Sequence, residues 1–157
     1  MKLFDFLPRS FSLLGRNQEI TNLSCDTRTL KPSSLYFCIK GERYDGHVFA
    51  IDAVKAGACA VVSEKELDLP KSVTQIIVQN ARAAMSEMAS NFNGNPDKDM
   101  LKIAVTGTNG KTTTTFLLRH ALTEAGYNVG VIGTNGSFTN RGEIKSSLTT
   151  PDPIELF

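Results

Sequence analysis

"AVTGTNGKTTTTF" (residues 104–116) combines the glycine, lysine and hydroxyl residues of a phosphate-binding loop in an unusual spacing. The standard loop reads G-x-x-x-x-G-K-[ST], which requires a glycine at position 105, where this chain has Val105. The nearest upstream glycine is Gly107, three residues before Gly110. The stretch is therefore either a shortened version of the loop or a structural turn that happens to be rich in threonine.

The segments on either side of this stretch predict a β-α-β unit. "LKIAVTG" (residues 101–107) has the pattern of a buried strand, and "NVGVIGTNG" (residues 128–136) predicts a second strand. Between them, residues 111–125 have the apolar spacing of a helix that stops at Gly126. Successive strands of such a unit should run parallel, with a right-handed crossover. The apolar residues expected on the buried face of the helix are Phe116, Leu117, Ala121, Leu122 and Ala125.

A glycine turn before a helix is a favourable place for a phosphate group, because backbone N–H groups and the helix dipole both attract an anion. Lys111 and Thr112 follow Gly110 in the required order, with the ammonium group placed to neutralise phosphate and the hydroxyl placed to reach Mg²⁺. A lone G-K-T is weak support, since strand, glycine turn and helix occur in most α/β proteins. Asn109, which tolerates left-handed torsions, and the four threonines from Thr112 onward favour the phosphate interpretation.

The first half of the chain alternates strand and helix patterns. Runs rich in β-branched and aromatic residues predict strands at residues 35–41, 59–64 and 75–80. Helical patterns cover residues 47–58 and 81–94, the first with apolar positions at Val48, Ile51, Ala53 and Val54. "NGNPDKD" (residues 93–99) has the composition of a linker. We therefore predict a small α/β domain over residues 1–95 and the start of a second domain over residues 96–157.

Composition and charge predict a soluble globular protein. The 157 residues are 41% hydrophobic and 21% charged, and no apolar run approaches the roughly 18 residues of a membrane span. The first 15 residues show no uninterrupted signal core, so we expect a cytoplasmic protein. A net charge of +1 gives no reason to expect nucleic acid or an anionic membrane as a partner.

Cysteine and histidine are too few and too scattered to predict a metal site. Cys25, Cys38 and Cys59 include no C-x-x-C pair, which disfavours both a disulfide framework and a zinc site. Cys38 and Cys59 lie among apolar residues, so we interpret them as buried thiols. The two histidines, His47 and His120, are far apart in the chain and are not favoured as a metal or acid-base pair.

"TGTNGKTTT" (residues 106–114) resembles the shortened ATP loop of the Mur ligases, which are ATP-dependent enzymes that add amino acids to the peptidoglycan precursor. "SCDTRTLKPSSLYFCIKGERYDGHVFAIDAVKAGACAVV" (residues 24–62) resembles the uridine-binding first domain of that family. "SSLTTPDPIEL" (residues 146–156) resembles its T-T-P-[DE] substrate loop. The resemblance covers nearly the whole chain. It implies a small amino-terminal α/β uridine-binding domain followed by the first β-α-β unit of a P-loop-type central domain.

Each of these segments also has a plain structural interpretation. "CDTR" (residues 25–28) would be a polar turn in which Asp26 and Thr27 bond the local backbone. "KGERYDG" (residues 40–46) would be a connecting loop, and "LTTPDP" (residues 148–153) an extended loop held by its prolines. The occurrence of all three segments in family order, with the ATP loop between them, favours the family.

The resemblance implies a role for particular residues. Lys111 would be the catalytic lysine that holds the β- and γ-phosphates of ATP, and Thr112 would bind Mg²⁺. The residues implied to bind ATP are Gly107, Thr108, Asn109, Gly110, Lys111, Thr112 and Thr113. Those implied to bind the uridine nucleotide are Cys25, Thr27, Glu42, Arg43 and Tyr44, while Thr149 and Thr150 would hold the muramoyl dipeptide region.

The implied activity is that of an ATP-dependent amide ligase. The carboxylate of UDP-N-acetylmuramoyl-L-alanyl-D-glutamate is phosphorylated, and the amine of L-lysine or meso-diaminopimelate then attacks the acyl phosphate. The resemblance also implies that this chain corresponds to the amino-terminal part of such enzymes, so we expect the 157 residues alone to be inactive. Two other hypotheses stay open. One is a module that only captures a UDP-sugar through residues 1–95, and the other is a related ligase for a different amino acid, which "TTPD" (residues 149–152) argues against.

Overall fold

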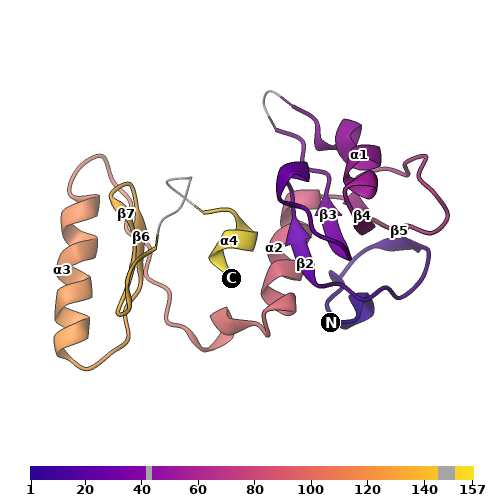
Figure 1. Cartoon of the computed structure of the whole chain (residues 1–157). Coiled ribbons are helices and arrows are strands. Elements are labelled where there is room, and N and C mark those ends of the chain that lie inside the picture. Colours follow the sequence, from indigo (N-terminus) through magenta and orange to yellow (C-terminus); the bar gives the residue numbers. More distant parts are fainter. Residues whose placement is uncertain (42–43, 145–150) are drawn as a thin grey trace. The chain divides into compact units, whose positions relative to one another are not determined.

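The computed structural model describes residues 1–41, 44–144 and 151–157. The chain divides into two compact units (Figure 1). The first unit is Met1–Lys98, with Phe157, and the second unit is Asp99–Leu156. The division falls inside the predicted linker at residues 93–99. In the part of the chain that is described, no helix is long and apolar enough to cross a membrane.

The first unit is built on a five-stranded sheet with the order β1-β5-β4-β3-β2. Its strands are β1 (Ser12–Leu14), β2 (Asn22–Ser24), β3 (Ser34–Phe37), β4 (Ala58–Ser63) and β5 (Thr74–Ile77). Strands β2 to β5 run parallel, and β1 pairs antiparallel with β5. Within the sheet, Leu35 of β3 lies between Leu23 of the edge strand β2 and Ala60 of the central strand β4. The carboxyl ends of four parallel strands therefore meet at one edge of the sheet.

The helices of the first unit confirm the alternating pattern predicted for it. They are η1 (Leu3–Asp5), η2 (Thr27–Thr29), η3 (Gly46–Phe49), α1 (Ala50–Lys55), α2 (Ala81–Phe92) and η4 (Pro96–Asp99). Helix α2 begins where the Asn80 side chain accepts a hydrogen bond from the Ala83 backbone N–H, and it ends at Asn93, as its sequence predicts. The predicted strands at residues 35–41, 59–64 and 75–80 correspond to β3, β4 and β5.

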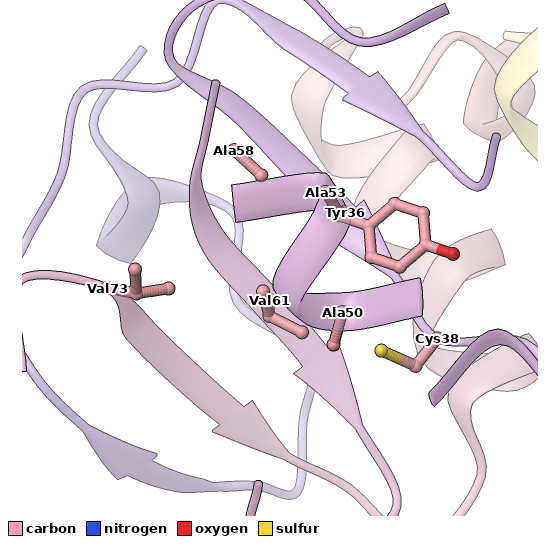
Figure 2. Close-up of a cluster of buried hydrophobic side chains, with 7 residues drawn as sticks. All are labelled: Tyr36, Cys38, Ala50, Ala53, Ala58, Val61 and Val73. Atoms are coloured by element: carbon pink, nitrogen blue, oxygen red, sulfur yellow. The ribbon is translucent and has the colours of Figure 1, made fainter. Parts of the chain in front are cut away.

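Small side chains let α1 pack closely on the sheet. Ala50 and Ala53 of α1 are buried together with Tyr36 of β3, Val61 of β4, and Cys38, which directly follows β3 (Figure 2). The predicted apolar face was partly wrong, because Val48 and Ile51 are 66% and 39% exposed. The segment begins as the 3₁₀ turn η3, whose three residues per turn rotate Val48 away from the face that α1 buries.

The second unit combines one helix with an antiparallel sheet of order β6-β7-β8. Its elements are α3 (Lys111–Glu124), β6 (Val131–Gly133), β7 (Gly136–Thr139), β8 (Gly142–Ile144) and α4 (Pro153–Leu156). Helix α3 packs on the sheet through Phe116, whose ring meets Phe138 edge-on at 5.5 Å between centroids. The guanidinium of Arg119 lies over the same Phe138 ring and donates a hydrogen bond to the Thr139 carbonyl. The α/β class is thus confirmed in both units.

The predicted β-α-β arrangement is wrong in two respects. Residues 101–107 form no strand, and Leu101 and Ile103 are 85% and 54% exposed. Strand β6 pairs antiparallel with β7 rather than parallel with an earlier strand. Two-residue turns at residues 134–135 and 140–141, each followed by a glycine with positive φ, close these hairpins over very short loops. A parallel pair would instead have to close across a whole helix, which costs more chain entropy.

The buried face of α3 also differs from the expectation. Phe116 and Leu122 are half-buried as predicted, but Leu117, Ala121 and Ala125 are exposed. Leu118 and Arg119 are half-buried in their place. In the described part of the chain, Phe138 of β7 packs against Phe116 and Arg119, which places this side of α3 against the sheet.

Candidate functional site

The carboxyl edge of the parallel sheet carries the predicted uridine-site residues of the first unit. Cys25 and Thr27 follow β2, and Tyr44 follows the neighbouring strand β3. In open α/β sheets, ligands bind at this edge. Cys25 and Thr27 are half-buried, whereas Tyr44 is 73% exposed. Glu42 and Arg43 lie outside the described residues.

The turn after β2 is held by its own polar groups. The Asp26 carboxylate accepts hydrogen bonds from the Arg28 backbone N–H at 2.9 Å and from the Arg28 guanidinium at 2.6 Å. The hydroxyl of Ser24 donates to the Asp26 carbonyl. The hydrogen bonds from the Arg28 side chain hold the pKa of Asp26 below its usual value. Asp26 therefore shapes the turn, as the polar-turn interpretation foresaw, and the turn places Cys25 and Thr27 at the sheet edge.

This ion pair predicts a pH dependence of stability. A folded pKa below the unfolded one stabilises the fold above the unfolded pKa, and this stabilisation disappears as the pH falls through the folded pKa. We expect Asp26→Asn to lower the free energy of unfolding at neutral pH and to reduce its loss between about pH 5 and pH 3. Urea titrations across this range test the prediction, with Asp68→Asn at an exposed carboxyl as the matched control. An unchanged acid profile in Asp26→Asn would contradict it.

The loop after β3 is fixed by two side chains that the sequence did not single out as partners. Asp45 accepts hydrogen bonds from the His47 backbone N–H at 3.0 Å and from the His47 Nδ1 at 2.6 Å. The backbone hydrogen bond is the main reason that the pKa of Asp45 lies below its usual value. The imidazole is almost fully buried. The one signal in the sequence was the tripeptide D-G-H, in which the aspartate can cap the following turn.

The prediction of buried thiols is confirmed for Cys38 and only partly for Cys59. Cys38 is fully buried, and this burial raises its pKa to about 12, so that it stays protonated. Cys59 is half-buried, and its pKa is also raised by burial. Neither thiol is therefore suited to act as a nucleophile.

The predicted phosphate loop of the second unit lies at the start of a 14-residue helix. Gly110, at φ 78°, precedes Lys111, the first residue of α3, and no side chain caps this end. Gly107 also has a positive φ, of 144°. The backbone N–H groups of a first helical turn have no carbonyl partner within the helix. Since residues 107–114 are exposed, these N–H groups are accessible to an anion.

The side chain of Lys111 is folded back over this loop. Its ammonium group donates to the carbonyls of Gly107 at 2.5 Å and Thr108 at 3.3 Å. The positive charge thus lies against the loop that would surround a phosphate group. The structure brings together the predicted residues from Gly107 to Thr113 and places the ammonium of Lys111 within the loop.

Two threonines of α3, Thr112 and Thr115, differ in what their hydroxyl groups can bind. The hydroxyl of Thr115 donates to the Thr112 carbonyl at 2.8 Å, so Thr115 serves the helix itself. Thr112 lies exposed in the first turn, next to the loop. The described residues contain no group of three or more His, Cys, Asp or Glu side chains that could hold a metal ion. A hydroxyl such as that of Thr112 would suit Mg²⁺, which keeps several waters and takes its other ligands from bound phosphates. Thr149 and Thr150 lie outside the described residues.

Both halves of the chain match known protein families. Residues 19–93 match the family described as "Mur ligase family, catalytic domain", and residues 105–157 match "Mur ligase middle domain". A UDP-N-acetylmuramoyl-L-alanyl-D-glutamate--2,6-diaminopimelate ligase from Clostridium botulinum is 42% identical over 93% of this chain and 31% of its own length. The ligase of the same name from Alkaliphilus metalliredigens is 37% identical over 99% of this chain and 32% of its own length.

Solved structures agree with these matches. A structure of a UDP-N-acetylmuramoyl-L-alanyl-D-glutamate--2,6-diaminopimelate ligase covers 87% of this chain with a TM-score of 0.66 and 26% identity, and the match takes 28% of that protein. MurF from Acinetobacter baumannii covers 67% of this chain with a TM-score of 0.52 and 29% identity, over 22% of its own chain. The fold and the two matched domains are those of Mur ligases. The chain belongs to the Mur ligase family, and it spans about a third of the length of the curated relatives above.

Proposed function

We propose that the chain supplies the nucleotide sites of an ATP-dependent amide ligase that acts in the cytoplasm on UDP-N-acetylmuramoyl-L-alanyl-D-glutamate. The observation that carries this proposal is the exposed loop from Gly107 to Gly110, with the Lys111 ammonium folded over it, at an uncapped helix start. The relatives from Clostridium botulinum and Alkaliphilus metalliredigens are named as 2,6-diaminopimelate ligases. Their names favour diaminopimelate over L-lysine as the amino acid that is added.

The proposal divides the work between two domains, residues 1–95 and residues 96–157. The first would hold the uridine nucleotide at the carboxyl edge of its sheet through Cys25, Thr27, Tyr44 and the neighbouring Glu42 and Arg43. The second would hold ATP at the start of α3, with Thr149 and Thr150 directed to the muramoyl dipeptide. Support for the first assignment comes from the shared edge at which β2 and β3 end.

The residues of the ATP loop can donate hydrogen bonds and positive charge to the phosphates of ATP. The backbone N–H groups from Gly107 to Thr113 would donate to phosphate oxygens, and Lys111 would exchange its two carbonyl partners for the β- and γ-phosphates. The Thr112 hydroxyl would be a ligand to Mg²⁺. When bound, ATP would supply the phosphoryl group that activates the substrate carboxylate. Lys111 and the loop would position the transferred phosphoryl group and neutralise its charge.

A titration of the 157-residue chain followed by amide NMR tests the two sites separately. Mg-ATP should shift the amide signals of residues 107–113, and UDP should shift those near Cys25, Thr27 and Tyr44. Binding of UDP without any response of residues 107–113 to Mg-ATP would favour the UDP-sugar-binding module instead. If neither ligand shifts these signals, the proposed function is wrong.

The division into domains makes a further prediction. The first unit contains its own five-stranded sheet and buried core, so residues 1–98 should fold when expressed alone. We expect a circular dichroism spectrum with both helix and sheet content and a single cooperative thermal transition. A spectrum typical of an unfolded chain would show that residues 1–98 are not a domain.

A further inference from the structure

The buried side chain of His47 connects two loops at the carboxyl edge of the sheet. Its Nδ1 lies 2.6 Å from the Asp45 carboxylate, and its Nε2 lies 3.1 Å from the backbone nitrogen of Glu64. An amide N–H can only donate, so Nε2 must accept and cannot carry a proton. The proton of the neutral ring is therefore on Nδ1, where it is donated to Asp45. Both contacts are satisfied only by this neutral tautomer.

The contact lies at the base of the loop that carries Tyr44. Asp45 forms an isolated antiparallel bridge with Lys40, and the Gly41 N–H donates to the Tyr44 carbonyl at 2.8 Å. The Gly46 N–H donates to the Ile39 carbonyl at 2.9 Å. These bonds close the base of the loop on itself, but they do not connect it to the rest of the sheet.

His47 supplies a connection from this loop to the neighbouring strand. Glu64 is the first residue after β4, and its carboxylate accepts a hydrogen bond from the Ala81 N–H at the start of α2. A chain of hydrogen bonds therefore runs from Asp45 through His47 and Glu64 to α2. The packing is tight at this point, since a Cβ on Gly46 would lie 2.6 Å from the Ile39 nitrogen. The base of the loop cannot shift without breaking one of these contacts.

We propose that His47 is a positioning residue for the uridine nucleotide. In its neutral form it holds the base of the loop against β4, which keeps Tyr44 at the carboxyl edge beside Cys25 and Thr27. Loss of the imidazole would remove the acceptor of the Glu64 N–H, release the loop and weaken nucleotide binding. This inference rests on the uridine site proposed above.

The test compares His47→Ala and His47→Gln in the 157-residue chain. His47→Ala should speed amide hydrogen exchange at Gly41 and Gly46 about tenfold and weaken UDP binding about tenfold, since it removes one charge-assisted and one neutral hydrogen bond. The amide of Cys38, which donates to the Val62 carbonyl within the sheet, should keep its exchange rate. His47→Gln retains an acceptor for Glu64 and should restore part of both effects.

Comparison of the two substitutions separates positioning from a general loss of stability. Rescue by the conservative variant is the readout, because His47→Gln keeps an acceptor for the Glu64 N–H and should recover UDP affinity together with the exchange rates at Gly41 and Gly46. His120→Gln, which replaces the other histidine of the chain, exposed on α3, should leave both quantities unchanged. If His47→Ala does not fold, exchange and UDP binding in His47→Gln decide the question.

The outcomes distinguish this inference from the proposed function. Equal exchange at Gly41 and Gly46 in the unmodified chain and the folded His47 variants overturns the positioning role. Equal UDP affinity in His47→Ala and in the unmodified chain does the same. A chain that shows no UDP binding overturns the proposed uridine site, while the exchange rates still decide whether His47 holds the loop.

Discussion

Replacing Lys111 with alanine is expected to weaken Mg-ATP binding about a hundredfold, because the ammonium group would otherwise form charge-assisted hydrogen bonds to two phosphates. In the structure the same ammonium donates to the carbonyls of Gly107 and Thr108, so the variant also loses the group that orders the loop. The fold of the second unit should persist, since Lys111 is exposed and contributes nothing to the contact between Phe116 and Phe138.

Calorimetric titration with Mg-ATP measures this effect, and Lys98→Ala is the control. Lys98 is an exposed lysine of η4, so its removal changes the net charge by the same amount away from the loop. Lys111→Arg adds a second comparison, because arginine keeps the charge but changes its reach and geometry. Mg-ATP affinity in Lys111→Ala equal to that in Lys98→Ala would remove Lys111 from the proposed site.

The sequence was most informative where strands are buried on both faces. Such strands are continuous apolar runs, and residues 35–37 and 60–62 could be recognised without any knowledge of their neighbours. Residues 101–107 have the same pattern but remain without a strand partner. An apolar run indicates that a segment can be buried in a sheet, but it does not predict which strand the segment will pair with.

Site residues could likewise be predicted from the sequence only where they lie close together in the chain. The phosphate loop is a local feature, so its glycines, Lys111 and Thr112 could all be proposed from a single stretch of sequence. The role of His47 depends on Glu64, 17 residues later and on another strand end. Only the fold brings these two residues together, which is why the D-G-H tripeptide could be interpreted as a turn but not as a connection between loops.

The largest loss of stability is expected from Phe37→Ala. Phe37 is the last residue of β3, is fully buried, and pairs with Val62 of β4 in the middle of the sheet. Removing its ring leaves a cavity that neighbouring strands cannot close without disturbing their hydrogen bonds. Substitutions of this kind cost about 3 to 5 kcal/mol, which is a large part of the total stability of a domain of this size.

The consequence should extend to the proposed uridine site, because β3 ends at Phe37 and the loop that carries Tyr44 follows directly. Urea unfolding of the 157-residue chain measures the loss in free energy, and Phe11→Ala is the matched control. Phe11 has the same side chain but is 40% exposed, so its removal should cost much less. Equal losses in the two variants would mean that Phe37 is not buried in the core, and the packing of β3 on which the edge site depends would then be wrong.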